Sequence, residues 1–274
     1  QQFDPGVSPW ALANPLSAEL AVMRTSLWPG LAMAVLHNQS RQQNRVRLFE
    51  AGLRFTPAAD GLEQVPMLAG IVSGDAFSAS WNNPKNSLDF FDVKGDLERV
   101  LDPLHFVTQA SQHPALHPGR SAQVLLKSAS GLHVVGWIGE LHPGLQQAYE
   151  LPQAPVLFEL DLEPIRDLGL PIPQELSKFP AVQRDLAVVV KQSIPAQSLL
   201  DAMMGAKQNF VKTIELFDEF KPKVGSGSMA DDEKSLAFRI TLLNPNETLQ
   251  DPQIDAVMAA LLGAVEKKCA ARLR

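Results

Sequence analysis

The sequence predicts an α+β protein with two domains in series. Over roughly the last hundred residues, strand-like apolar runs and two helix-like stretches follow one another in the order βαββαβ. This order is typical of a ferredoxin-like module, in which two helices cover one face of four antiparallel strands. Upstream of it, the prolines of the segment from Gly169 to Pro173 block a continued helix and favour an extended connector. We therefore expect domains at residues 1–170 and 174–274.

The elements of the second domain follow from apolar periodicity. Asp251 is expected to cap the final helix, with Pro252 in its first turn. The aspartate side chain can accept a hydrogen bond from an unpaired backbone amide of the first turn, and proline has no amide hydrogen that would need a partner. One apolar stripe runs along this helix: Ile254, Val257, Met258, Leu261, Leu262 and Val265. It should pack on one strand face: Leu236, Phe238, Ile240 and Leu242. The expected strands are 185–190, 213–220, 234–243 and 269–274, and the expected helices are 195–207 and 252–268.

The opposite face of this sheet is expected to be a shallow platform of small and cationic residues. A nucleic-acid base can stack on Phe217 or on a guanidinium while hydroxyl and backbone groups read its edges. With a single aromatic, the face departs from the platforms that stack RNA on several rings. Alternation alone does not decide between such a platform, a solvated face and a face packed on another domain. The residues that alternate onto it are Asp185, Ala187, Phe217, Ser235, Ala237, Arg239, Thr241, Arg272 and Arg274.

Composition narrows the class of protein. The chain has 274 residues, of which 45% are hydrophobic and 20% charged, which is ordinary for globular domains. No apolar run reaches transmembrane length and no export signal is recognisable, so a cytoplasmic protein is expected. The net charge is −6, and residues 175–274 hold 13 basic and 13 acidic side chains, so the excess acid lies upstream. Any RNA contact should therefore be local and geometric, not a broad basic footprint.

Two further features concern the compartment and the chain start. The single cysteine, Cys269, excludes an intrachain disulfide and a Cys-rich zinc site, and its apolar surroundings predict a core position. The sequence begins at Gln1 without a methionine, so we expect a processed or truncated chain with further domains upstream.

Several segments resemble a known family. The second domain resembles the ferredoxin-fold anticodon-binding domain of the β subunit of bacterial phenylalanyl-tRNA synthetases in SKFPAVQRDLAVVV, IELFDEF, KSLAFRITL and ETLQD. The first is similar to the catalytic-like domain of the same subunit in residues 14–55, FFDVKGDLE, HPALHPGRSA and VGWIGELHP. The resemblance implies a class II synthetase-like antiparallel sheet domain followed by an anticodon-binding domain. The RNA-binding residues that it implies are Arg184, Asp185, Phe217, Ser235, Arg239, Arg272 and Arg274.

Two segments depart from the catalytic subunit of that family. Its motif 2 reads Gly-Arg-Val-Tyr-Arg, whereas residues 52–56 read Gly-Leu-Arg-Phe-Thr and end without the arginine. Its motif 3 resembles Phe-Gly-Leu-Gly-Leu-Glu-Arg, whereas residues 158–164 place acids at both glycines and proline at the arginine. Carboxylates repel a triphosphate, and the lost guanidiniums would have clamped it. Arg54 is expected on the strand face opposite the one needed to replace them. No catalytic, cofactor-binding or metal-binding residue is therefore expected.

The resemblance also implies partners. In that family the α subunit joins phenylalanine to tRNA(Phe) with ATP and Mg²⁺, in a heterotetramer of two α and two β subunits. This chain would be a noncatalytic scaffold that buttresses α and binds the anticodon, with a partner interface on the helix that begins near Pro29. Two alternatives remain: an autonomous class II-like ligase that uses Glu140 or His142 as acid or base, and a protein-interaction fragment that binds no RNA.

Three weaker patterns have simpler interpretations. His113 and His117 have the spacing of helical metal ligands, but the prolines after each argue against a helix. The glycine-containing segment from Lys221 to Asp232 is followed by a strand, which favours a hairpin loop over a phosphate-binding loop. The acids around Lys94 are either a cation site or, as we expect, the exposed side of an amphipathic helix. The acids are Asp92, Asp96 and Glu98, and the apolar side is Val93, Leu97, Val100 and Leu101.

Overall fold

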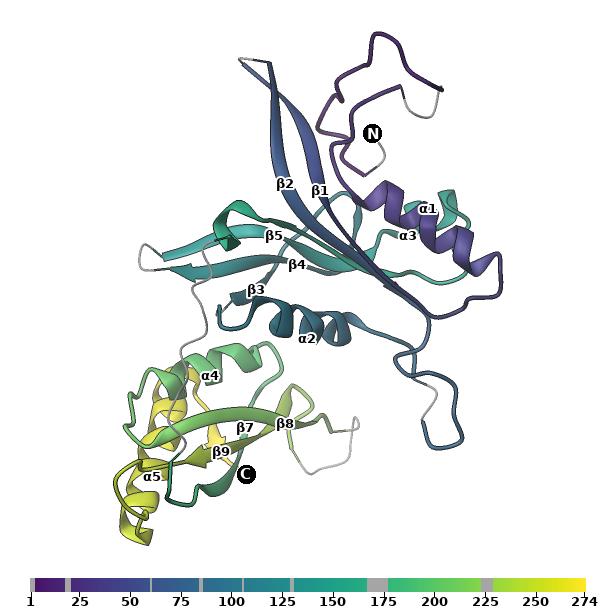
Figure 1. Cartoon of the computed structure of the whole chain (residues 1–274). Coiled ribbons are helices and arrows are strands. Elements are labelled where there is room, and N and C mark those ends of the chain that lie inside the picture. The colour runs from purple at the N-terminus through teal and green to yellow at the C-terminus, as the bar shows by residue number, and fades with distance from the viewer. Residues whose placement is uncertain are drawn as a thin grey trace. The chain divides into compact units, whose positions relative to one another are not determined.

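The chain divides into two compact units, each with its own sheet and core (Figure 1). The first unit is Gln1–Pro171 and the second is Ile172–Arg274. The computed structural model describes residues 3–17, 21–59, 61–83, 86–104, 106–128, 131–166, 177–222 and 229–274. The expected connector at 169–173 lies outside these residues, and the domain limits 1–170 and 174–274 stay a prediction. The α+β class is confirmed.

The first unit is built on a six-stranded antiparallel sheet with the order β1-β2-β6-β5-β4-β3. The strands β1 and β2 form a ribbon that extends beyond the rest of the sheet (Figure 1). The elements are α1 (Trp28–Gln39), β1 (Val46–Ala58), β2 (Gly61–Ser73), α2 (Phe90–Leu101), β3 (Phe106–Ala110), β4 (Leu116–Ser128), β5 (Gly131–Leu141), α3 (Pro143–Ala148), β6 (Val156–Asp161) and a 3₁₀ turn at Glu163–Ile165.

Helices cover both faces of this sheet (Figure 1). The apolar residues of α1 belong to one core and those of α2 to another. The central strand β6 contributes to both, because Leu157 packs in the α1-side core while Phe158 and Leu160 pack in the α2-side core. Strand alternation therefore places Glu159 on the α1 side, in a strand that is covered on both faces.

The amphipathic helix predicted around Lys94 is confirmed as α2, and its acids have structural roles. Asp92 and the N-cap Asp89 exchange hydrogen bonds in a capping box, Asp96 pairs with Arg47 at 2.7 Å, and Glu98 pairs with Lys94. Three of the four predicted apolar residues are buried: Val93, Leu97 and Leu101. The prediction for Val100 is wrong. It is 54% exposed, although its spacing of seven residues from Val93 places it on the same side of the helix.

The second unit is the predicted βαββαβ module, with a four-stranded antiparallel sheet in the order β10-β7-β9-β8. Its core lies between the sheet and the two helices, and the predicted strand face of β9 forms its centre. The strands β8 and β9 are antiparallel neighbours, so their connection is a hairpin as predicted; residues 223–228 of that loop lie outside the described part. The elements are β7 (Val182–Lys191), α4 (Ala196–Met204), β8 (Val211–Phe220), β9 (Glu233–Leu242), α5 (Asp251–Cys269) and β10 (Arg272–Leu273).

Two predictions at the ends of α5 are wrong. The helix begins at Asp251 itself, and the N-cap is Gln250, which exchanges hydrogen bonds with Gln253 in a capping box. At the other end, Cys269 is the last helical residue and not part of a strand. The chain turns at Ala270, whose φ of 51° is left-handed, so only Arg272–Leu273 remain to pair as β10. Cys269 is nevertheless buried in the core, as expected.

The described ranges contain no candidate for a membrane-spanning helix. None of the helices there is long and apolar enough to cross a bilayer.

Candidate functional site

The sheet of the second unit has one face covered by α4 and α5, and we call the other the helix-free face. Strand pairing places Asp185 beside Arg239, Ala187 beside Ala237 and Val189 beside Ser235 on it. At the sheet edge, Arg272 pairs with Val189, and the backbone amide of Arg274 donates to the Ala187 carbonyl. The alternation predicted from the sequence therefore holds across β7, β9 and β10.

Arg239 is held by two contacts on the helix-free face. Its Nε and terminal nitrogen each donate to one Asp185 carboxylate oxygen at 3.0 Å. Its guanidinium also lies over the Phe217 ring, 4.7 Å from the centroid. The hydrogen bond from Arg239 is the main cause that lowers the pKa of the exposed Asp185 carboxyl. Three residues predicted for RNA binding therefore form one ordered cluster.

A second arginine–aromatic stack lies on the same face, and the sequence analysis missed it. The pairing of β8 with β9 shifts by one residue between Leu216 and Asp218, which is a β-bulge. Beyond the bulge, Phe220 pairs with Ser235, and the Arg274 guanidinium lies 5.2 Å from the centroid of the Phe220 ring. Strict alternation would put Phe217 and Phe220 on opposite faces, so no period-two pattern reveals this stack. Among the described residues, two aromatic rings, Phe217 and Phe220, stack with arginines on this face, where the sequence analysis expected one.

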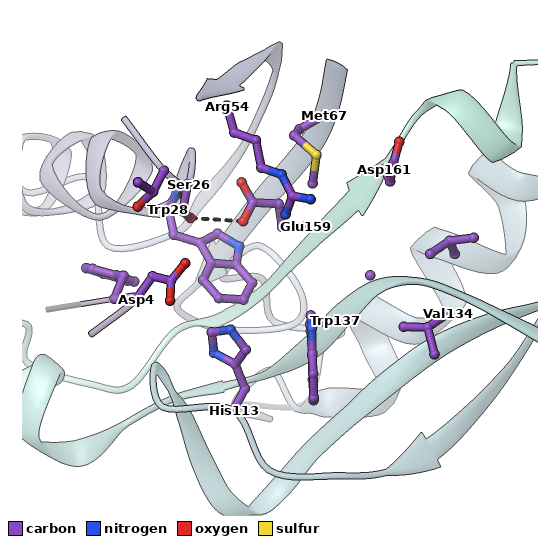
Figure 2. Close-up of a pocket in the computed structure, with 14 residues that line it drawn as sticks. Asp4, Ser26, Trp28, Arg54, Met67, His113, Val134, Trp137, Glu159 and Asp161 are labelled. Carbon is purple, nitrogen blue, oxygen red and sulfur yellow. Dashed lines mark hydrogen bonds between the residues drawn. The ribbon is translucent and has the colours of Figure 1, made fainter. Parts of the chain in front are cut away.

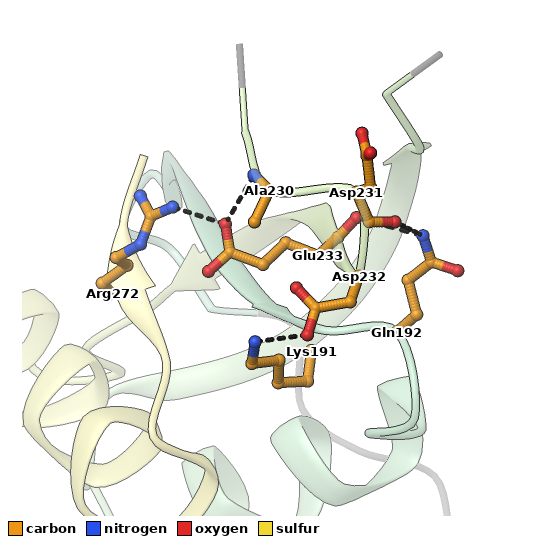
Figure 3. Close-up of polar contacts among 7 residues, drawn as sticks. All are labelled: Lys191, Gln192, Ala230, Asp231, Asp232, Glu233 and Arg272. Carbon is orange, nitrogen blue, oxygen red and sulfur yellow. Dashed lines mark hydrogen bonds and ion pairs between the residues drawn. The ribbon is translucent and has the colours of Figure 1, made fainter. Parts of the chain in front are cut away.

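Arg272 is tied to the end of the sheet (Figure 3). Its guanidinium donates to Glu233 Oε2 at 2.7 Å, and the Ala230 backbone amide donates to the same oxygen at 3.2 Å. The ion pair between Lys191 and Asp232 lies alongside. Of the three arginines on the helix-free face, Arg239 and Arg272 form ion pairs with Asp185 and Glu233. Arg274 forms no ion pair within the described parts of the chain and stacks on Phe220.

Two of the seven predicted RNA-binding residues are not presented on this face. Ser235 lies in the right row, but only 2% of it is exposed. Arg184 pairs in register with the core residue Ile240, so its side chain lies on the helix-covered side, 3.9 Å from Asp251 at the start of α5. Arg184 therefore lies off the platform, as the alternation predicted, because adjacent strand residues point to opposite faces, and its expected RNA binding gains no support from this face. RNA binding by the other five stays a prediction.

The first unit contains a cavity of about 190 Å³ on the α1 side of its sheet (Figure 2). Residues of β1, β2, β5 and β6 line it, and β1 and β6 hold the motif 2-like and motif 3-like segments. The aromatic residues around it include Trp28, His113 and Trp137, and its charged residues are Asp4, Arg54, Glu159 and Asp161.

Glu159 is the most buried charged group of this cavity, with 7% of its surface exposed. One oxygen accepts a hydrogen bond from the Leu27 amide at 2.7 Å. The other accepts from the Ser26 hydroxyl at 2.9 Å (Figure 2). Burial raises the pKa of the Glu159 carboxyl, and these two hydrogen bonds and the charge of Arg54 oppose the shift. The carboxylate thus anchors the start of α1 to the centre of the sheet.

Arg54 points into the cavity beside Glu159 (Figure 2). The expectation that it faces away from the cleft is wrong. Side chains two positions apart on a strand share a face, so Arg54 lies on the same face as Thr56, the position of the lost arginine. The cavity therefore retains one guanidinium, but Asp4, Glu159 and Asp161 surround it with an excess of negative charge.

The groups considered for an autonomous enzyme are engaged elsewhere. Glu140 pairs with Arg120 at 2.8 Å, and the His142 ring accepts from the Gly144 amide at 3.1 Å as the cap of α3. His113 accepts from the Ala115 amide at 3.1 Å, and burial lowers the pKa of its imidazole. Across the described ranges, no three His, Cys, Asp or Glu residues are grouped closely enough to hold a metal ion.

The raised pKa of Glu159 predicts a pH-dependent stability. Above the ordinary value of 4.5, the unfolded chain releases the Glu159 proton while the folded chain still holds it. The folded state then binds more protons, so this group makes stability fall as pH rises from 4.5 through the folded pKa. Urea unfolding of wild type and Glu159→Gln, at steps from about pH 4 to about pH 8, should show wild type losing stability relative to the variant. A difference that stays flat or grows with pH would contradict this.

Comparisons with known proteins match both units. The family profile "Phenylalanyl tRNA synthetase beta chain CLM domain" matches residues 1–162, and the profile "Ferredoxin-fold anticodon binding domain" matches residues 177–274. A pyrrolysyl-tRNA synthetase structure from Desulfitobacterium hafniense shares 16% identity over 58% of this chain and 51% of that one, and its TM-score of 0.40 is too low to bear on function.

Curated relatives agree with the family profiles. The phenylalanine–tRNA ligase β subunit of Cupriavidus pinatubonensis is 46% identical over 100% of this chain and 35% of its own length. Those of Dechloromonas aromatica and Pseudomonas syringae pv. tomato are 43% and 41% identical, over 96% and 99% of this chain. The chain spans about a third of each relative, 33–35% of their lengths. One profile matches more than half of the residues, and the second matches residues 177–274, which form the sheet with the helix-free face. The chain therefore belongs to the family of phenylalanyl-tRNA synthetase β chains.

Proposed function

We propose that this chain is the scaffold and anticodon-binding part of a phenylalanine–tRNA ligase β subunit. In the assembled enzyme it supports ATP-dependent attachment of phenylalanine to tRNA(Phe) by the α subunit, in the cytoplasm. ATP and Mg²⁺ belong to the α subunit, and two α and two β subunits form the heterotetramer. The names of the curated relatives and the two family profiles support this assignment.

The observation that carries the RNA-binding part is the pair of arginine–aromatic stacks on the helix-free face. Arg239 over Phe217 and Arg274 over Phe220 each present a flat, cationic surface on which a base can stack. The nearby carboxylates Asp185 and Glu233 limit the net positive charge. Binding should therefore depend on stacking geometry more than on long-range attraction.

The charge of the cavity supports a noncatalytic first unit. The cavity has three acidic side chains, Asp4, Glu159 and Asp161, and one basic side chain, Arg54. Its net negative charge repels the triphosphate of ATP, which a catalytic site must instead hold with positive charge. The alternative of an autonomous ligase has no support from Glu140 and His142, whose side chains are tied to Arg120 and the Gly144 amide.

The proposed domain limits remain 1–170 and 174–274. They are supported by profile matches that end at residue 162 and resume at 177, and by the division of the structure after Pro171.

The test is tRNA(Phe) binding by the assembled ligase, with substitutions placed in the complete β chain. Arg239→Met and Arg274→Met should each weaken binding roughly tenfold, because a base loses its stacking plane. Arg184→Met is the matched control, since Arg184 is on the same sheet but on its helix-covered side. Affinity is measured by filter binding or anisotropy over a range of salt concentrations.

Three outcomes are distinguishable. Weakening with an unchanged salt slope indicates stacking, and a slope reduced by about one indicates a phosphate contact, both of which support the proposal. Equal affinities for wild type, Arg239→Met and Arg274→Met would remove the helix-free face from the anticodon site. They would favour the protein-interaction alternative for this chain.

A further inference from the structure

The cavity of the first unit holds two opposite charges with unused bonding capacity. The buried Arg54 Nε has no hydrogen-bond acceptor among the described residues, and the guanidinium forms no ion pair there. Glu159 accepts one hydrogen bond on each oxygen, from Leu27 and Ser26, whereas a carboxylate has about four acceptor positions. A buried polar atom without a partner is uncommon in folded proteins and calls for one.

The two groups lie next to each other and point into the same space (Figure 2). An α-amino acid carries its ammonium and its carboxylate on one carbon, so its charges need neighbouring partners of opposite sign. Glu159 suits the ammonium, and Arg54 suits the carboxylate. A ligand with only one charge would leave one of the two protein groups unpaired in a shielded site.

The walls and the size of the cavity define the rest of the ligand. Trp28, Met67 and Trp137 provide an apolar and aromatic surface around the charged pair. The volume of about 190 Å³ is below the range of drug-sized pockets and suits a small metabolite. The remaining carboxylates, Asp4 and Asp161, make the cavity net negative and disfavour phosphates and other simple anions.

We infer that this cavity is a binding site for a free α-amino acid with an apolar side chain. This inference goes beyond the proposed anticodon function and does not depend on it, because every residue involved lies in the first unit. The site is noncatalytic: it pairs both charges of the amino acid and carries no clamp for ATP.

The experiment uses the 274-residue chain alone, so that no α subunit contributes an amino acid site. L-leucine and L-phenylalanine are titrated by calorimetry and by tryptophan fluorescence, which reports on Trp28 and Trp137 in the cavity wall. N-acetyl-L-leucine lacks the ammonium and L-leucinamide lacks the carboxylate. We expect saturable binding of at least one free amino acid, roughly tenfold weaker binding of both blocked forms, and no binding of ATP.

Variants identify the contacts. Arg54→Met should weaken binding of the free amino acid about tenfold and leave the weak binding of leucinamide unchanged, because leucinamide has no carboxylate to lose. Arg54 Nε has no hydrogen-bond partner in the described protein, so removal of the guanidinium should leave the fold intact, which circular dichroism checks. Arg47→Met, on the same strand but paired with Asp96, is the matched control and should bind like wild type.

The inference is overturned if neither amino acid binds saturably to the folded chain. It is also overturned if a blocked form binds as tightly as free leucine, if Arg54→Met binds the free amino acid like wild type, or if ATP binds. Glu159→Gln provides the reciprocal check: it should weaken binding of the free amino acid but not the weak binding of N-acetyl-leucine, which has no ammonium.

Discussion

Replacement of Phe238 by alanine is expected to lower the free energy of unfolding of the second unit by about 3–5 kcal/mol. Phe238 lies at the centre of β9, has 0% exposure, and packs among core residues of both neighbouring strands and α5. The deleted ring would leave a cavity that β9, paired on both sides, cannot collapse to fill. Because domains are stable by only about 5–15 kcal/mol, this loss threatens the whole unit.

Two signals of one unfolding experiment separate the units. All four tryptophans, Trp10, Trp28, Trp81 and Trp137, belong to the first unit. Tryptophan fluorescence therefore follows the first unit, whereas far-ultraviolet circular dichroism follows both. For Phe238→Ala, we expect an early loss of circular dichroism at a urea concentration where fluorescence is still native.

Phe217→Ala is the matched control for this prediction. Phe217 lies on the neighbouring strand β8 but on the helix-free face and is 49% exposed. Its removal should cost less than about 1 kcal/mol of stability, because it loses an exposed cation–π contact and no core packing. Equal destabilisation by both substitutions would contradict the assignment of the two phenylalanines to opposite faces.

Replacement of Trp28 by alanine is expected to destabilise the first unit by about 3–5 kcal/mol. Trp28 is 1% exposed, its indole nitrogen donates to the Phe158 carbonyl at 2.9 Å, and its ring lies edge-on to His113 at 5.2 Å. The substitution removes both the ring volume and the hydrogen bond that joins α1 to β6. Urea unfolding followed by fluorescence of the remaining tryptophans measures the loss.

Two further variants divide this effect. Trp28→Phe retains much of the ring but no donor for the Phe158 carbonyl, so it should cost about 1–3 kcal/mol, less than alanine. Trp81→Ala removes a side chain that is 96% exposed and should leave stability unchanged within about 0.5 kcal/mol. A Trp28→Ala chain as stable as Trp81→Ala would show that α1 is not anchored through this indole.

The order and type of elements in the second unit follow from local patterns. The apolar stripe of α5 and the alternation along β9 each require one buried face, and the βαββαβ order leaves few ways to bury both. The ends of α5 were less predictable, because Asp251 and Gln250 can both cap a helix and the choice depends on the reciprocal bond from Gln253.

The sequence by itself determined the fold class, the order of elements in the second unit, the helix-covered face of its sheet and the loss of both arginine motifs in the first unit. Only the tertiary structure decided that a bulge in β8 brings Phe220 under Arg274, and that Arg54 and Glu159 meet in one cavity. The physical reason is the separation along the chain of the residues that interact. Periodicity records which face of an element is buried, whereas a register shift and the meeting of β1 and β6 side chains in one cavity depend on strands far apart in the chain.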